Sequence, residues 1–136
     1  MVRAFVTAGD LKQALRIIES QLAKAPNEAE LLLLKGDVLL ESGQSEKATS
    51  AYMATHELMP DDQEPFLRMA EMHESAGRLE QAAEFYNKAI QLVSTDPLPY
   101  LMRSSLMSRM GREREAESDR MTAAALRRQR GAIEQR

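Results

Sequence analysis

The amino-acid sequence predicts an all-α protein, a solenoid of stacked antiparallel helix pairs, and two observations carry this prediction. The first is a 34-residue period in which a glycine is followed five residues later by an alanine. The glycines are Gly9, Gly43, Gly77 and Gly111, and the alanines are Ala14, Ala48, Ala82 and Ala116. The second is apolar residues at the three- and four-residue spacing of a helical face, with no sustained strand-like alternation. A fixed period of this length is typical of repeat arrays.

The composition fits a helical array and excludes several classes of protein. Because aromatic residues make up only 4% and Trp is absent, the core is expected to consist of Leu, Ala, Met and Ile. The absence of Cys excludes disulfides, thiolate catalysis and Cys-ligated zinc. No apolar run approaches the roughly 18 residues that span a bilayer. We expect a soluble protein of unknown compartment, with the cytoplasm favoured over the periplasm or another exported location.

The net charge of −3 hides an uneven distribution along the chain. Residues 28–74 contain eleven Asp and Glu against three Lys and Arg, whereas residues 112–136 contain seven Arg against five acids. The acidic middle argues against nucleic acid as a partner, since phosphate binding needs Lys and Arg.

Seven helices are expected, and local signals place their ends. The expected ranges are 10–24, 28–42, 45–58, 63–76, 79–92, 97–110 and 113–130. Three of the starts have a capping residue followed by an acid three residues later or directly by proline: Asn27 with Glu30, Asp61 with Glu64, and Asp96 with Pro97. The first helix of each pair should stop near its glycine, where a positive φ carries no steric penalty.

The second helix of the best-defined pair follows Gly43. Its apolar and small residues recur at helical spacing, as Ala48, Ala51, Tyr52, Thr55 and Leu58. Pro60 then ends it, because proline disfavours helix in the preceding Met59.

Small residues recur at matched points of the helices that form each pair. They are Gly36, Ala70 and Ser104 in the first helices and Ala48, Ala82 and Ala116 in the second. We expect them to allow close approach of the two helices. The larger residues beside them are Leu32, Phe66, Tyr100, Tyr52 and Tyr86.

These positions resemble the tetratricopeptide repeat (TPR) family over nearly the whole chain. The matching residues are Gly36, Ala48, Tyr52 and Pro60; Phe66, Ala70, Ala82, Tyr86 and Ala89; Tyr100, Ala116 and Ala123; and, in a partial first repeat, Ala14 and Pro26. The resemblance implies a right-handed α-solenoid of about three and a half repeats. Departures are Lys35 and Arg103, which stand where the family usually has Leu, and Arg120, which replaces an aromatic residue.

The resemblance divides one solenoid domain into repeats. They are a partial N-terminal repeat (1–26), full repeats at 27–60 and 61–94, a terminal repeat with a polar last helix (95–130), and a tail (131–136). Val2, Phe5 and Val6 form an apolar face without a complete partner helix. They suggest a piece of a longer array, with a natural start as the alternative, and could also mediate self-association.

No residue pattern supports catalysis, so we expect no enzyme activity, metal or cofactor. His73 lies between Glu71 and Glu74, which makes a metal site conceivable, but no His at the i,i+4 spacing of a zinc helix accompanies it. A packing role in place of the family's Tyr is the favoured interpretation.

In tetratricopeptide proteins the first helices line a concave groove that binds peptides or partner helices. The resemblance places in that groove Leu33, Asp37, Leu40, Glu41, Leu67, Glu71, Glu74, Leu101, Ser105 and Arg109. The leucines could equally be ordinary packing residues between repeats. Asp37 and Glu71 stand where some family members hold a chaperone's C-terminal carboxylate, so like-charge repulsion argues against that role.

The function predicted from the sequence is a protein-interaction scaffold. Its partner is an unidentified protein or peptide segment, expected to be amphipathic and basic, with no nucleic acid and no membrane insertion. Two alternatives remain open: a self-assembly or spacer module, and a regulatory part of a larger multidomain protein.

Overall fold

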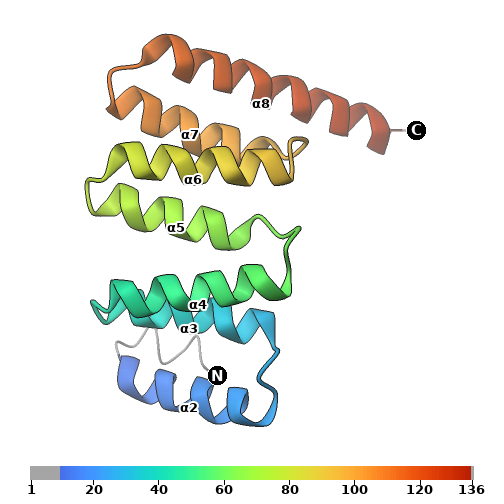
Figure 1. Cartoon of the computed structure of the whole chain (residues 1–136). Coiled ribbons are helices and arrows are strands. Elements are labelled where there is room, and N and C mark those ends of the chain that lie inside the picture. The colour runs from blue at the N-terminus through green and yellow to red at the C-terminus, as the bar shows by residue number, and fades with distance from the viewer. Residues whose placement is uncertain (1–9, 136) are drawn as a thin grey trace. The chain divides into compact units, whose positions relative to one another are not determined.

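The computed structural model describes residues 10–135, and within this range the protein is all-helical (Figure 1). The helices are α2 (Leu11–Lys24), α3 (Ala29–Glu41), α4 (Ser45–Leu58), α5 (Glu64–Ser75), α6 (Leu79–Leu92), α7 (Pro97–Arg109) and α8 (Glu113–Glu134). The all-α fold class predicted from the sequence is confirmed. Val2, Phe5, Val6 and Gly9 lie outside the described residues.

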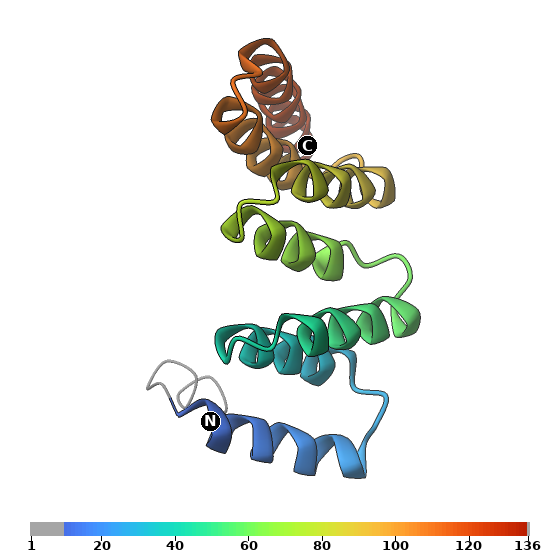
Figure 2. The same ribbon diagram turned by 60° about the vertical axis from the view of Figure 1, so that its left-hand side comes forward.

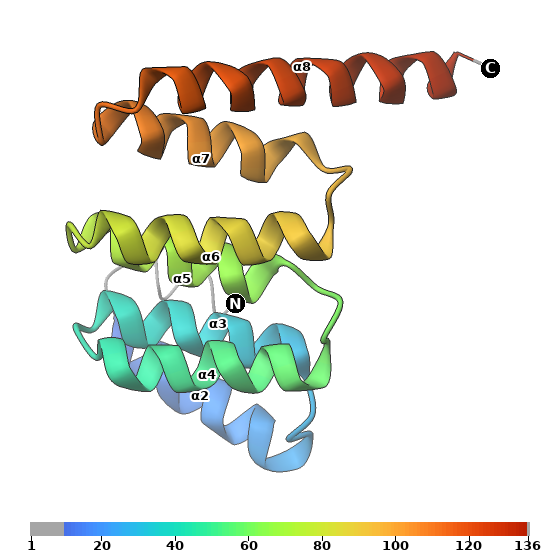
Figure 3. The same ribbon diagram turned by 45° about the horizontal axis from the view of Figure 1, so that its top comes forward.

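The chain divides into two compact units, and the division falls within α5 after Arg68. In unit 1, which ends at Arg68, α2 packs on α3 and α3 packs on α4 (Figure 2). In unit 2, which begins at Met69, α6 packs on α7 and α7 on α8 (Figure 3). Within each unit, helices joined by a short turn run antiparallel, as α3 with α4 and α7 with α8.

The repeated glycines end the first helix of each pair. Gly43, Gly77 and Gly111 have φ values of 79°, 77° and 75°, a backbone region that side-chain-bearing residues rarely adopt. After α3, the Gly43 N–H donates to the Leu40 carbonyl and the Gln44 N–H donates to the Leu39 carbonyl. This pair of bonds is the Schellman motif, and it recurs after α5 and α7. The inner turns are therefore built as predicted.

The matched small residues lie at close helix contacts. Ala48, Ala82 and Ala116 are completely buried, one in each second helix. A methyl group at Gly36 would collide with the ring of Tyr52, which is itself fully buried. The close approach of α3 and α4 therefore needs glycine at this position.

The predicted helix starts are confirmed at one of three sites. Asp96 caps α7, and its carboxylate accepts a hydrogen bond from the Leu98 N–H at 2.9 Å. The box of Asn27 and Glu30 was wrong, because the N-cap of α3 is Glu28 and its side chain makes no capping bond.

At α5 the expected capping residue was also wrong, by one position. Asp62, and not Asp61, accepts from the N–H of Glu64 at 3.0 Å. The capping hydrogen bond therefore joins residues two apart in sequence, and not three apart as in the expected capping box. Runs of adjacent polar residues offer several possible caps, and the path of the connecting chain selects one.

The last helix is longer than expected. It continues to Glu134, four residues beyond the predicted end at 130, so residues 131–134 are helical and do not form a tail. Gly131 does not end it, because its φ is not positive. Figure 3 shows the C-terminal part of α8 extending past the N-terminal end of the antiparallel α7.

Candidate functional site

In unit 1 the predicted binding residues form an acidic face on α3, made of Leu33, Asp37, Leu40 and Glu41. Both leucines are half-buried, and Glu41 is exposed. The buried Tyr52 of α4 donates its hydroxyl hydrogen to the Asp37 carboxylate at 2.7 Å. The helix pair thus fixes one carboxylate of this face and leaves the other in solvent.

Arg68, from the second turn of α5, lies beside the same carboxylate. Its Nε is 3.5 Å from Asp37 Oδ1, and its terminal nitrogen is 3.9 Å from Glu64. The side chains of Arg68 and Asp37 are each about one-third exposed. The acidic face therefore carries its own partial counter-charge, which the sequence alone does not predict.

Leu67 does not belong to an exposed surface. Its exposed fraction is 3%, so its side chain is part of the core. Of the two interpretations that the sequence left open for the leucines, packing applies to Leu67, whereas Leu33 and Leu101 retain partial exposure.

In unit 2 the end of α5 repeats the tyrosine–carboxylate arrangement with a different acid. Tyr86 of α6 donates to Glu74 Oε2 at 3.4 Å, and Arg109 of α7 lies 3.6 Å from Glu74 Oε1. Burial, and then the neighbouring Glu74 and Glu71, raise the pKa of the Tyr86 phenol above its ordinary value. Tyr86 thus remains protonated and acts as a donor.

The other predicted site residues of unit 2 differ in exposure. Glu71 and Ser105 are exposed, Leu101 is half-buried, and the Arg109 side chain is 54% exposed. The structure brings Glu74 and Arg109 into an ion pair across α5 and α7.

His73 has a packing role. Its ring stacks on Phe85 with 5.3 Å between centroids, and its Nδ1 accepts from the Arg78 Nε at 2.8 Å. Burial, and then the charge of Arg78, lower the pKa of the His73 imidazole from its ordinary 6.5, while Glu84 opposes them. Among residues 10–135 no group of three or more His, Asp and Glu is placed to hold a metal ion.

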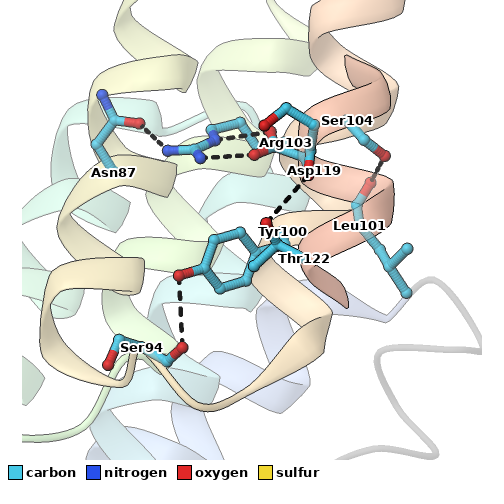
Figure 4. Close-up of polar contacts among 9 residues, drawn as sticks. Asn87, Ser94, Tyr100, Leu101, Arg103, Ser104, Asp119 and Thr122 are labelled. Atoms are coloured by element: carbon cyan, nitrogen blue, oxygen red, sulfur yellow. Dashed lines mark hydrogen bonds and ion pairs between the residues drawn. The ribbon is translucent and has the colours of Figure 1, made fainter. Parts of the chain in front are cut away.

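A polar network in unit 2 links three helices and was missed in the sequence (Figure 4). The Arg103 guanidinium of α7 donates twice to the Asp119 carboxylate of α8, at 2.8 and 2.7 Å, and once to Asn87 Oδ1 of α6, at 2.7 Å. The hydrogen bond to Asp119 is the largest cause of a raised pKa at Arg103.

Aligning the repeats identifies the two positions of the ion pair, although it does not show that they meet. The position of Arg103 is taken by Met69 one repeat earlier, and the position of Asp119, sixteen residues on, is taken by Phe85. Two apolar residues in one repeat are thus replaced by an ion pair in the next. The Asp119 side chain is only 7% exposed, so the ion pair replaces part of the core.

Around this network lies a polar pocket of about 390 Å³ between α6, α7 and α8. Its charged lining contains two arginines and four acids, namely Arg103, Arg112, Glu80, Glu84, Glu115 and Asp119. Arg112 and Glu80 also pair with each other, at 2.8 Å. Most of the positive charge in this pocket is therefore already matched within the protein.

The same fold occurs in several solved structures. MamA from Desulfovibrio magneticus RS-1, solved from residue 41 to its end, aligns with a TM-score of 0.75 at 22% identity, over 95% of this chain and 73% of that one. A further MamA crystal structure has a TM-score of 0.71 at 19% identity, over 93% and 74% of the two chains. The Cut9–Hcn1 hetero-tetramer of the APC/C has a TM-score of 0.74 at 18% identity, over 91% of this chain and 24% of that one. At these identities the likeness shows the fold alone.

No curated protein sequence matches the chain. Within residues 10–135, no helix is both long enough and apolar enough to cross a membrane. The family model described as the Psidin N-terminal TPR repeats region matches residues 4–133, nearly the whole sequence. The glycines that end the first helices and the buried alanines of the second helices agree with this match. The chain therefore belongs to the family of the Psidin N-terminal tetratricopeptide repeat region.

Proposed function

We propose that this chain is a protein-interaction scaffold whose first helices bind a basic, amphipathic partner segment. Its family supports the general role, since tetratricopeptide repeats serve mostly as non-enzymatic protein-binding scaffolds. A neighbour in fold, Cut9–Hcn1, is described as a hetero-tetramer and therefore as an assembly of protein chains.

The acidic face of α3 is the observation that carries the proposal. Half-buried Leu33 and Leu40 each lie about one helical turn from Asp37, and Leu40 is adjacent to Glu41. Partly exposed leucines offer apolar contact, and adjacent carboxylates offer charge complementary to Lys or Arg. A helix that carries leucines on one side and basic residues beside them matches this face.

Two arginines of the chain itself already pair with the acids that a basic partner would contact. Arg68 neutralises part of the charge on Asp37, and Arg109 does the same at Glu74 in unit 2. Exposed ion pairs of this kind contribute about 0–1 kcal/mol, so a basic side chain of a partner can replace them at little cost. Glu41 and Glu71, which are exposed, should contribute most to attraction at long range.

The test uses a synthetic amphipathic helical peptide with leucines on one side and lysines on the other. Its affinity for the whole chain is measured at low and high ionic strength, by titration calorimetry. Glu41→Lys should weaken binding by about threefold to tenfold at low salt and flatten the salt dependence. Leu33→Ser should weaken binding equally at both salt concentrations, because it removes apolar contact.

The matched control is Glu46→Lys, the same charge change at an exposed position of α4. It should leave the affinity within about twofold of the unmodified protein. Glu71→Lys reports separately on unit 2. If Glu41→Lys and Glu71→Lys both behave as Glu46→Lys does, the first helices do not bind basic segments and the proposal fails.

The self-assembly module and the regulatory part of a larger protein stay predictions. Light scattering of the whole chain at several concentrations addresses the first of them. A mass that rises with concentration and is unaffected by Glu41→Lys would favour self-assembly through another surface.

A further inference from the structure

A concave surface of unit 1 lies on another face of α3, away from the acidic face. This leucine pocket has a volume of about 470 Å³ and is formed by α2, α3 and α4. Its apolar lining includes Leu15, Leu32 and Leu39, and its basic residues are Lys35 and Lys47. Leu32, Lys35 and Leu39 share one stripe of α3, separate from the acidic face.

The chain contains a natural control for this pocket. The polar pocket of unit 2 is built largely from the same repeat positions, 68 residues later, with Arg103 in the place of Lys35. There Asp119 stands where unit 1 has Ala51, and it holds the guanidinium with two hydrogen bonds. The Asp119 carboxylate that holds Arg103 in unit 2 thus has no counterpart in unit 1, where the pocket is larger, at about 470 Å³ against 390 Å³.

Lys35 is only loosely held by its own unit. Its ammonium nitrogen lies 3.9 Å from Glu19 Oε1, and that carboxylate is itself 54% exposed. Such a pair is weak and easily exchanged for another carboxylate. The leucine pocket therefore offers a cation that a bound carboxylate can reach beside an apolar lining.

The charge of the two pockets has opposite sign. The leucine pocket is lined by two lysines and one glutamate, whereas the polar pocket has two arginines and four acids. Lys47 in the first corresponds to Glu115 in the second. Within these linings, a ligand that carries negative charge is attracted to the leucine pocket and repelled by the polar pocket.

We propose that the leucine pocket binds an acidic peptide segment, which inserts one large apolar side chain and pairs its carboxylates with Lys35 and Lys47. The apolar lining supplies contact for the inserted side chain, and the two lysines select for the flanking acids. This goes beyond the proposed function, because it concerns a different face of α3 and a partner of opposite charge.

The probe is a synthetic hexapeptide with a Trp-Leu core between two pairs of Glu, and the controls replace the Glu residues with Lys or with Ser. Since the protein contains no Trp, the fluorescence of the peptide reports binding without background. We expect the acidic peptide to bind at least about tenfold more tightly than the basic one. In methyl NMR spectra, signals of Leu15, Leu39 and Ala51 should shift, and those of Ala83 and Met107 should not.

Two substitutions transfer the features of unit 2 to unit 1. Lys47→Glu copies the charge of Glu115 at an exposed position and should weaken the acidic peptide by about threefold to tenfold. Ala51→Asp copies Asp119 and should abolish binding, because the new carboxylate takes up Lys35. Since Ala51 is buried, this variant could unfold, and Lys47→Glu then decides alone.

The matched control is Lys12→Glu, an equal charge change at an exposed position of α2 outside the pocket. Equal affinity for the acidic and basic peptides, equal effects of Lys47→Glu and Lys12→Glu, or shifts confined to unit 2 would each overturn the proposal. Glu41→Lys should not weaken the acidic peptide, and Lys47→Glu should not weaken the lysine-bearing peptide that tests the acidic face. Failure of one proposal is therefore distinguishable from failure of the other.

Discussion

The phenol of Tyr52 donates a 2.7 Å hydrogen bond to the carboxylate of Asp37, and so joins the core of unit 1 to its acidic face. Tyr52 is completely buried and presses on Gly36, while Asp37 reaches solvent. The Tyr52 side chain thus packs between the two helices and also orients a carboxylate of the candidate binding face.

Tyr52→Phe tests this link. It retains the packed ring and removes a hydrogen bond to a charged group, which should lower the free energy of unfolding by about 1.5–3 kcal/mol. Urea unfolding followed by circular dichroism measures it. Tyr86→Phe is the matched control, because the bond of Tyr86 to Glu74 is longer, at 3.4 Å, and its loss should be smaller. A larger loss in Tyr86→Phe would contradict this ranking.

The Arg103–Asp119 ion pair should be replaceable by two apolar residues, but not by one. Arg103→Met leaves a nearly buried carboxylate without its partner and should destabilise the protein by about 2–4 kcal/mol, less than for a fully buried pair because Arg103 is partly exposed.

Adding Asp119→Phe to that variant recreates the Met69 and Phe85 arrangement of the preceding repeat. We expect the double variant to recover most of the lost stability, as measured by thermal unfolding. A double variant no more stable than Arg103→Met would show that α7 and α8 require the polar network.

Glycine substitutions should have opposite signs at two positions. Gly43→Ala forces a residue with a side chain into positive φ, and although nothing crowds the site, it should cost about 1–2 kcal/mol. Gly131→Ala lies in helical backbone with open space around it and should stabilise the protein by about 0.5 kcal/mol. Chemical denaturation compares the two, and equal signs would refute the conformational explanation.

His73 should make stability depend on pH. Because burial and Arg78 hold its pKa in the folded protein below the ordinary 6.5, the unfolded chain takes up the proton first. The contribution of neutral His73 to the free energy of unfolding is therefore fully present above pH 6.5. It is lost as pH falls from there through the lower pKa of the folded state.

His73→Gln should flatten the unfolding free energy over that pH range, as urea titrations at successive pH values would reveal. The stack on Phe85 is lost in this variant at every pH, so the slope, and not the absolute stability, is the quantity to compare. An unchanged slope would assign the pH dependence to other groups.

The sequence by itself determined the helices and their turns. The ends of the first helices are predicted by Gly43, Gly77 and Gly111, and the closest helix packing by Ala48, Ala82 and Ala116. Both signals can be read from the sequence because each acts within one helix pair. Expected boundaries were within one residue of the observed ones except at the end of α8, where Gly131 did not stop the helix. Asp96 was recognisable as a cap because Pro97 directly follows it.

Only the tertiary structure decided which side chains meet. Several contacts depend on how helices from different parts of the sequence are placed. They are the burial of Leu67, the ion pairs of Arg68 and Arg109, and the network of Arg103. Periodicity assigns a residue to a face of its helix, but not to a partner on another helix. Leu33 and Leu67 occupy equivalent repeat positions, and yet Leu33 is partly exposed and Leu67 is core, because burial depends on the neighbours that each helix meets.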